Sequence, residues 1–136
     1  MKYYIDACIW RDYFENRSDN FRPLGEWAFK LIKKAINEGE LIIYSDLVVE
    51  ELKKEYSDNQ IIEMFSIVPI ELLSKVEISE KQVLNSAILS RKLNIPRKDM
   101  LHAVLAKDNE AILVSRDKHF HQLERYVDVK QPEDLI

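Results

Sequence analysis

Cysteine, glycine and proline are scarce in this sequence, and each scarcity excludes a class of structure. The 136 residues contain one cysteine, Cys8, so the chain cannot form an internal disulfide or a cysteine-based zinc site. Two glycines and four prolines are too few for a linker or a low-complexity stretch, and no internal repeat is present. We therefore expect a single domain over residues 1–136, in which helices and strands follow one another closely.

Long apolar runs are also missing. No run approaches the ~18 residues that a membrane-spanning helix needs, and no charged and apolar leader with a cleavage site opens the sequence. These absences predict a cytoplasmic protein without a membrane partner. The formal net charge of −4 argues against a basic surface that coats nucleic acid. A nucleic-acid substrate would therefore need bound cations and local basic residues to receive it.

Apolar runs and helical spacing alternate along the chain. The runs predict strands at 2–5, 41–44 and 111–114, a short edge strand at 67–70 and a terminal strand at 127–129. Helical spacing predicts a short helix around 10–14, helices over 24–36, 46–56, 60–65, 80–93 and 98–107, and a last helix that begins near 117. Strands joined by long helical connections imply an α/β fold, a three-layer α/β/α sandwich with a mainly parallel central sheet.

Four acidic residues, Asp6, Glu51, Asp99 and Asp117, form the candidate site. Asp6 closes the first predicted strand, and Asp117 follows the strand at 111–114. The C-terminal ends of parallel strands share one edge of the sheet, where ligand sites gather, and adjacent strands lie about 4.8 Å apart. Carboxylates at that edge could ligate one divalent cation, and oxygen ligands suit Mg²⁺ or Mn²⁺. Taken alone, each aspartate could equally be a helix cap.

Helix geometry selects between two adjacent glutamates. A rotation of about 100° per residue puts Glu51 at the margin of the apolar face of the helix at 46–56 and Glu50 nearly opposite that face. Glu51 is therefore the candidate, with a rim ion pair as its alternative role and Glu50 as the fallback. Asp99 opens a helix with alanines one and two turns later on its own side, which leaves room for a cation. His102 is interpreted as a neighbour of the site or a packing residue rather than a ligand.

Basic residues stand beside two of the acids. The candidates for substrate binding are Arg97, Lys98, Arg116 and Lys118, because phosphate oxygens would arrive there, although such charges are often merely solvated. His119 and His121 are interpreted as surface residues, and His119 is close enough to Asp117 in sequence to contact a substrate.

Cys8 bears on two other enzyme classes. A cysteine-type phosphatase needs an arginine six residues after the nucleophile, but that position is Phe14, so a small buried thiol is the favoured interpretation. A magnesium-dependent phosphohydrolase would need a second aspartate two positions after Asp6, where Cys8 stands. Both classes are therefore less favoured than a site built from the four acids.

At these residues the chain closely resembles a PIN-domain ribonuclease, in particular the single-domain toxins of VapBC-type toxin–antitoxin pairs. YYIDACIW resembles the opening strand of the family with its first aspartate, Asp6, and SDLVVEEL resembles the segment whose acid aligns with Glu51. KDMLHAVLA resembles the segment of the third acid, Asp99. AILVSRDKHF resembles the strand and turn of the fourth, Asp117, with Ser115 at the usual hydroxyl position. The match covers nearly the whole length, with four short motifs in the family's order.

The resemblance implies cleavage of single-stranded or looped RNA by a metal-activated water. Asp6 and Asp99 would be direct ligands of Mg²⁺ or Mn²⁺, with Glu51 and Asp117 completing the cluster. Two departures from the family pattern are Cys8, where a small hydroxyl or amide residue is common, and His119, where a further acid is common. Because of Cys8, a hydrogen bond that the family makes at the site is in doubt. Because of His119, an additional metal position is in doubt.

The resemblance also implies partners: a homodimer and an antitoxin peptide laid across the groove. Four aromatic residues could contribute to a dimer interface, although core positions are favoured for them: Trp10, Tyr13, Phe14 and Trp27. The competing hypothesis is a catalytically idle PIN-like module that binds RNA or a protein. The RNA target cannot be named from the sequence.

Overall fold

The computed structural model describes residues 1–136, in which five strands alternate with helices. The strands are β1 (Lys2–Ile5), β2 (Leu41–Tyr44), β3 (Leu73–Lys75), β4 (Ile112–Val114) and β5 (Val129–Lys130). The helices are α1 (Ala7–Glu15), α2 (Leu24–Asn37), α3 (Asp46–Lys53), α4 (Asp58–Phe65), α5 (Glu80–Leu93), α6 (Arg97–Asp108) and α7 (Lys118–His121). None of these helices is long and apolar enough to cross a bilayer.

All strand pairs are parallel, in the order β3-β2-β1-β4-β5. The central strand β1 pairs with β2 on one side and β4 on the other, and Tyr4 is in register with Ile43 and Leu113. The chain builds outward from β1 to β3 and then crosses to β4. The strand order therefore reverses between β1 and β4, and the carboxyl ends of those two strands are where open α/β sheets form ligand sites.

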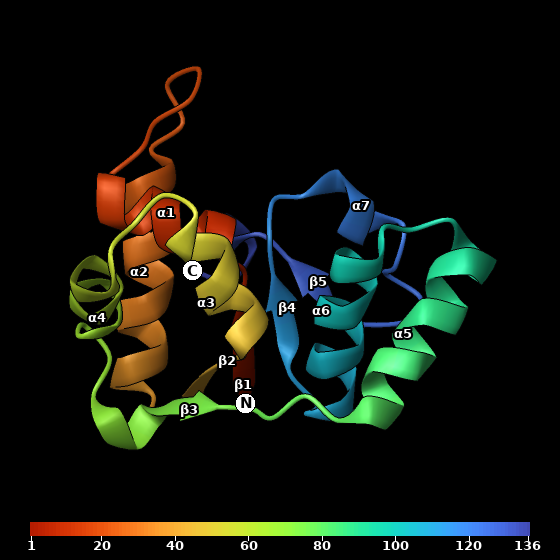
Figure 1. Cartoon of the computed structure of the whole chain (residues 1–136). Helices are drawn as coiled ribbons and strands as arrows, with labels where there is room; N and C mark the ends of the chain where they lie inside the picture. The colour runs from red at the N-terminus through yellow and green to blue at the C-terminus, as the bar shows by residue number, and fades with distance from the viewer.

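Helices cover the sheet from both sides. Figure 1 shows α1, α2 and α4 on one side of the sheet and α5 and α6 on the other. Strands buried on both faces need continuous apolar sequence, as the run Tyr3-Tyr4-Ile5 provides. The predicted three-layer α/β/α sandwich is confirmed, and its sheet is wholly parallel.

Two of the predicted strands are wrong in position. Pro69 has no N–H to donate, and it precedes a 3₁₀ turn at Ile70–Leu72, so the edge strand begins at Leu73 rather than within 67–70. At the C-terminus, the backbone N–H of Val127 bonds to the carbonyl of Leu123, 3.0 Å away, which keeps Val127 in the preceding turn. The last strand therefore pairs only from Val129.

The helix α1, which follows the first candidate acid, is held tightly in place. Trp10 of α1 is fully buried against Phe65, with ring centroids 4.6 Å apart. Gly25 brings α2 against the end of α1, where a Cβ atom at position 25 would lie 2.5 Å from Cα of Asn16. The remaining aromatic residues considered for an interface, Tyr13, Phe14 and Trp27, are half-buried.

Candidate metal centre

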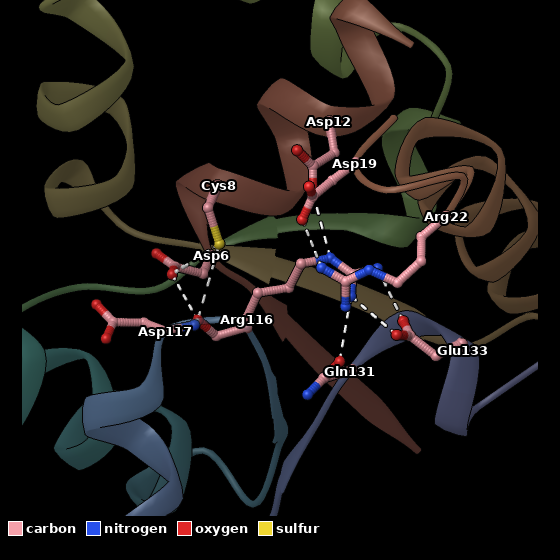
Figure 2. Close-up of polar contacts among 10 residues, drawn as sticks. Asp6, Cys8, Asp12, Asp19, Arg22, Arg116, Asp117, Gln131 and Glu133 are labelled. Carbon is pink, nitrogen blue, oxygen red and sulfur yellow. Dashed lines mark hydrogen bonds and ion pairs between the residues drawn. The ribbon is translucent and has the colours of Figure 1, made fainter. Parts of the chain in front are cut away.

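Asp6 combines a helix cap with a buried position at the centre of the sheet edge. It is the N-cap of α1, and its Oδ1 accepts a hydrogen bond from the Ala7 N–H at 2.8 Å. Its Oδ2 accepts from the Ser115 hydroxyl at 2.8 Å and from the Cys8 thiol at 3.3 Å. Figure 2 shows Asp6 and Cys8 facing the start of the loop that follows β4. The cap therefore fixes a carboxylate that is only 6% exposed.

Ser115 connects the first acid to the last. Its buried Oγ donates to Asp6 and accepts from the Asp117 N–H at 3.0 Å. Asp117 caps α7, since its side chain accepts from the His119 N–H. The two strand-end aspartates are thus joined through one hydroxyl, across the point where the strand order reverses.

A pocket of about 370 Å³ opens at this edge of the sheet. Its lining is mostly charged: Asp6, Cys8, Arg11, Glu51, Arg116 and Asp117. Three of the four predicted acids therefore share one pocket.

Glu51 is held by a buried chain of hydrogen bonds. Its Oε1 lies 2.7 Å from Nε2 of His102, whose Nδ1 lies 2.7 Å from the Tyr4 hydroxyl. The Tyr4 hydroxyl in turn lies 2.7 Å from Oγ of Ser45. Both ring nitrogens of His102 are occupied, so it orients Glu51 from behind. Glu50, the fallback, is exposed.

The bond between Glu51 and His102 shifts the pKa of both groups. Burial alone would lower the pKa of His102, but the Glu51 bond and the surrounding carboxylates raise it above its ordinary value. Burial alone would raise the pKa of Glu51, but the same bond lowers it below its ordinary value. The pair therefore favours a charged Glu51 facing the pocket.

Asp99 approaches the site from α6. Its Oδ2 lies 2.9 Å from Nδ1 of His119, and the same nitrogen lies 3.4 Å from Oδ1 of Asp117. Burial raises the pKa of Asp99, His119 opposes that rise, and the nearby charge of Asp117 adds to it, so that the pKa remains above its ordinary value. Two carboxylates crowd one another here, with a histidine between them.

The structure brings the predicted acids to one edge of the sheet in two groups. Asp6, Glu51 and His102 form one, and Asp99, Asp117 and His119 form the other, with the ligand atoms of each group within 4.8 Å of one another. Such oxygen-rich sets fit a hard divalent cation, which would offset the mutual repulsion of the carboxylates.

The basic residues predicted to bind substrate differ in their placement. Arg97, Lys98 and Lys118 are exposed, and none forms an ion pair within the protein. Arg116 lines the pocket, but its three guanidinium nitrogens are taken up by other residues.

Figure 2 shows the Arg116 guanidinium directed away from Asp6. Its Nε donates to Asp12 at 3.3 Å, Nη1 to Gln131 at 3.1 Å, and Nη1 and Nη2 to Glu133 at 2.9 and 2.8 Å. Each guanidinium nitrogen therefore has a partner within the protein, and of the five N–H groups only one, on Nη2, is without a partner. Arg116 thus holds the loop between Ser115 and Asp117, and its expected contact with substrate stays a prediction.

Arg11 is a pocket residue that sequence reasoning missed. Its buried Nε makes no hydrogen bond and lies 3.6 Å from a Glu55 carboxylate oxygen. The sequence could have indicated that Arg11 faces the pocket, because Arg11 follows Cys8 by three residues and so lies on the same side of α1. The Tyr4 hydroxyl was missed because its ring sits in an apolar strand like its neighbours.

Comparisons with known proteins place this geometry in a family. The model of the PIN domain family matches residues 3–126. VapBC2 from Rickettsia felis, solved with a promoter DNA fragment, has a TM-score of 0.69 at 19% identity, covering 96% of this chain and 98% of that one. VapBC-1 from nontypeable Haemophilus influenzae has a TM-score of 0.69 at 17% identity, covering 98% and 99%.

A toxin–antitoxin complex from Klebsiella pneumoniae has a TM-score of 0.66 at 17% identity, covering 96% of this chain and 97% of that one. These likenesses concern the fold. No curated protein matches the chain in sequence. The family model spans nearly the whole chain and includes all four acids, so the chain belongs to the PIN-domain family.

Proposed function

We propose that this PIN-domain protein is a divalent-metal-dependent endoribonuclease and acts as the toxin of a toxin–antitoxin pair. One observation carries the proposal: Asp6, Glu51 and Asp117 line a single pocket at the carboxyl edge of a parallel sheet. Asp99 lies beside that pocket, linked to Asp117 through His119. Acidic pockets of this kind repel a phosphodiester unless a cation is present, so the charge itself argues for a bound metal.

The four acids would hold Mg²⁺ or Mn²⁺, with Asp6 and Asp99 as direct ligands and Glu51 and Asp117 completing the set. When bound, the cation lowers the pKa of an attacking water and offsets the charge of the phosphodiester. The chain contributes preorganisation. Asp6 is oriented by three donors and Glu51 by His102, so neither side chain must be ordered when substrate arrives.

Arg11 is the residue that we propose for contact with a phosphate. Replacing it by glutamine should raise KM about tenfold, the loss expected for one charge-assisted hydrogen bond of about 1.4 kcal/mol, while kcat changes less. Steady-state cleavage of a short RNA measures both constants. Arg17→Gln is the matched control, because Arg17 is an exposed arginine just beyond the same helix, paired with Glu15. Equal KM values for both variants would remove Arg11 from the substrate site.

Single-stranded or looped RNA is the proposed substrate class. The exposed Arg97, Lys98 and Lys118 carry no internal ion pair and lie at the starts of the helices that present Asp99 and Asp117. They would meet the phosphates that flank the bond to be cleaved, because phosphate contacts position a strand without specifying its sequence.

Metal binding should stabilise the folded protein. Mn²⁺ at about 100 times its dissociation constant would add about 2.7 kcal/mol to the free energy of unfolding, seen as a rise in melting temperature. Glu51→Gln should reduce this rise, whereas Glu50→Gln on the exposed face of α3 should keep it. Thermal melts with and without millimolar Mn²⁺ make the comparison. An unchanged melting temperature for the wild type would argue against a preformed site.

An antitoxin and a second copy of the chain are the proposed protein partners. Two of the similar folds come from VapBC proteins and one from a toxin–antitoxin complex, which supports an antitoxin. The homodimer follows from the family resemblance. An upstream reading frame that encodes a DNA-binding domain with an amphipathic tail would support the toxin role.

The test of the proposed activity is incubation with Mn²⁺ and a structured RNA, beside an Asp6→Asn variant. Metal-dependent fragments that disappear in the variant support a nuclease. RNA that stays intact under all conditions would favour a catalytically idle PIN-like module instead.

A further inference from the structure

His119 lies between two carboxylates at the start of α7. Its Nδ1 is 2.9 Å from Oδ2 of Asp99 and 3.4 Å from Oδ1 of Asp117. Its backbone N–H donates to the same Oδ1 of Asp117, so the main chain anchors the residue beside that carboxylate. The other ring nitrogen, Nε2, makes no hydrogen bond within the protein, and 42% of the side chain is exposed.

We propose that Asp99, Asp117 and His119 form a mixed oxygen and nitrogen ligand set for a divalent transition metal, so that this position prefers Mn²⁺ to Mg²⁺. The inference rests on the proposed function, because it assigns the metal preference of the same site. Mg²⁺ is bound in proteins through oxygen, whereas imidazole is a common ligand of first-row transition metals.

The spacing of the three ligand atoms supports coordination. Neighbouring ligands of an octahedral ion with bonds of about 2.1–2.2 Å lie about 3.0 Å apart. The two distances from the His119 nitrogen, 2.9 and 3.4 Å, bracket that value. All three ligand atoms lie within 4.8 Å of one another, a spread that one cation can span.

The alternative is that His119 serves only as a counter-ion between two acids. In that case the ring N–H would donate a hydrogen bond to Asp99, and added metal would compete with the histidine instead of being bound by it. The two hypotheses for His119 differ in one observable, namely whether a nitrogen is bonded to the metal.

The other histidines provide the contrast. His102 has both ring nitrogens engaged, by Glu51 and Tyr4, so neither is free for a cation. His121 is on the same short helix as His119 but faces Glu124, with its Nδ1 3.3 Å from that carboxylate. His121→Gln is therefore a matched control for His119→Gln.

The experiment is pulsed electron paramagnetic resonance on the full chain loaded with Mn²⁺, which detects a directly bonded ¹⁴N nucleus. We expect nitrogen modulation in the wild type and in His121→Gln, and its loss in His119→Gln. Titrations with Mn²⁺ and Mg²⁺ give the ratio of their affinities. His119→Asp, which makes the set all oxygen, should reduce that ratio at least about tenfold, since even residues behind metal ligands alter affinity by 10–100-fold.

Three results would overturn the inference: bound Mn²⁺ without nitrogen modulation in the wild type, modulation that persists in His119→Gln, or no retained Mn²⁺. RNA cleavage is measured on the same samples, so that the two proposals fail separately. Cleavage without a nitrogen signal overturns the ligand assignment alone. A nitrogen signal without cleavage upholds the ligand assignment and counts against the nuclease.

Discussion

Asp6→Asn should abolish metal-dependent RNA cleavage while the protein stays folded. Asparagine keeps the size of the side chain and an oxygen that can accept from the Ala7 N–H, so the cap of α1 survives. What it removes is one negative charge in the pocket and one of the proposed carboxylate ligands. We expect a loss of at least about 100-fold in kcat, comparable to removing a single preorganised group in other active sites.

Two measurements separate this effect from misfolding. Without metal, the melting temperature of Asp6→Asn should equal or exceed that of the wild type, because one source of carboxylate repulsion is gone. Asp58→Asn is the control, since Asp58 is an exposed acid in the first turn of α4 and does not line the pocket. Full activity in Asp6→Asn would rule out the proposed role of that carboxylate.

Among the substitutions considered, Arg116→Met should lower the free energy of unfolding the most. Arg116 provides the sole hydrogen bond to the carboxylate of Asp12, a residue only 5% exposed, and it also binds Glu133 through two nitrogens. Methionine fills similar space but removes the only ion-pair partner of both carboxylates. Breaking a buried ion pair by removing one partner costs about 3–5 kcal/mol, which chemical denaturation at pH 7 measures.

The loss in Arg116→Met should shrink as the pH falls. In the wild type, burial raises the pKa of Asp12 although Arg116 opposes the rise, and Arg116 lowers the pKa of Glu133 against the effect of burial. Without Arg116, the folded-state pKa of both acids moves upward. An acid whose pKa is raised by folding destabilises the protein once it ionises, so lowering the pH from 7 through the raised pKa values should recover part of the loss.

Two control variants show whether the loss of stability in Arg116→Met comes from its ion pairs. Arg125→Met, at an exposed arginine with no ion pair, should stay within about 0.5 kcal/mol of the wild type. Combining Arg116→Met with Asp12→Asn should restore part of the stability, because no buried charge is then left at position 12. A loss below about 1 kcal/mol in the single variant would mean that the ion pairs of Arg116 do not hold the loop.

Asp6 and Asp117 were predictable because the rule that places them is local. Each follows a short apolar run, and parallel strands bring such positions to one edge wherever the helices pack. Glu51 was equally predictable from the sequence, because the choice between it and Glu50 depends only on helical rotation.

Arg116 and His119 were not predictable in their roles, because their partners are set by tertiary structure. Glu133 lies 17 residues after Arg116 in a C-terminal 3₁₀ turn, and no sequence pattern marks that turn as a neighbour of α2. His119 meets Asp99 only because α6 and α7 pack together. The strand at 67–70 was misplaced because an apolar run can pack into the core without joining a sheet, as buried Val68 does.

Anomalous diffraction from crystals soaked in Mn²⁺ is the most direct test of whether the acids form one metal centre. We expect a peak in the pocket about 2.0–2.3 Å from a carboxylate oxygen of Asp6, with a further acid of the four within the same range. A fully occupied peak away from all four acids, or none at millimolar Mn²⁺, would contradict the proposed metal centre.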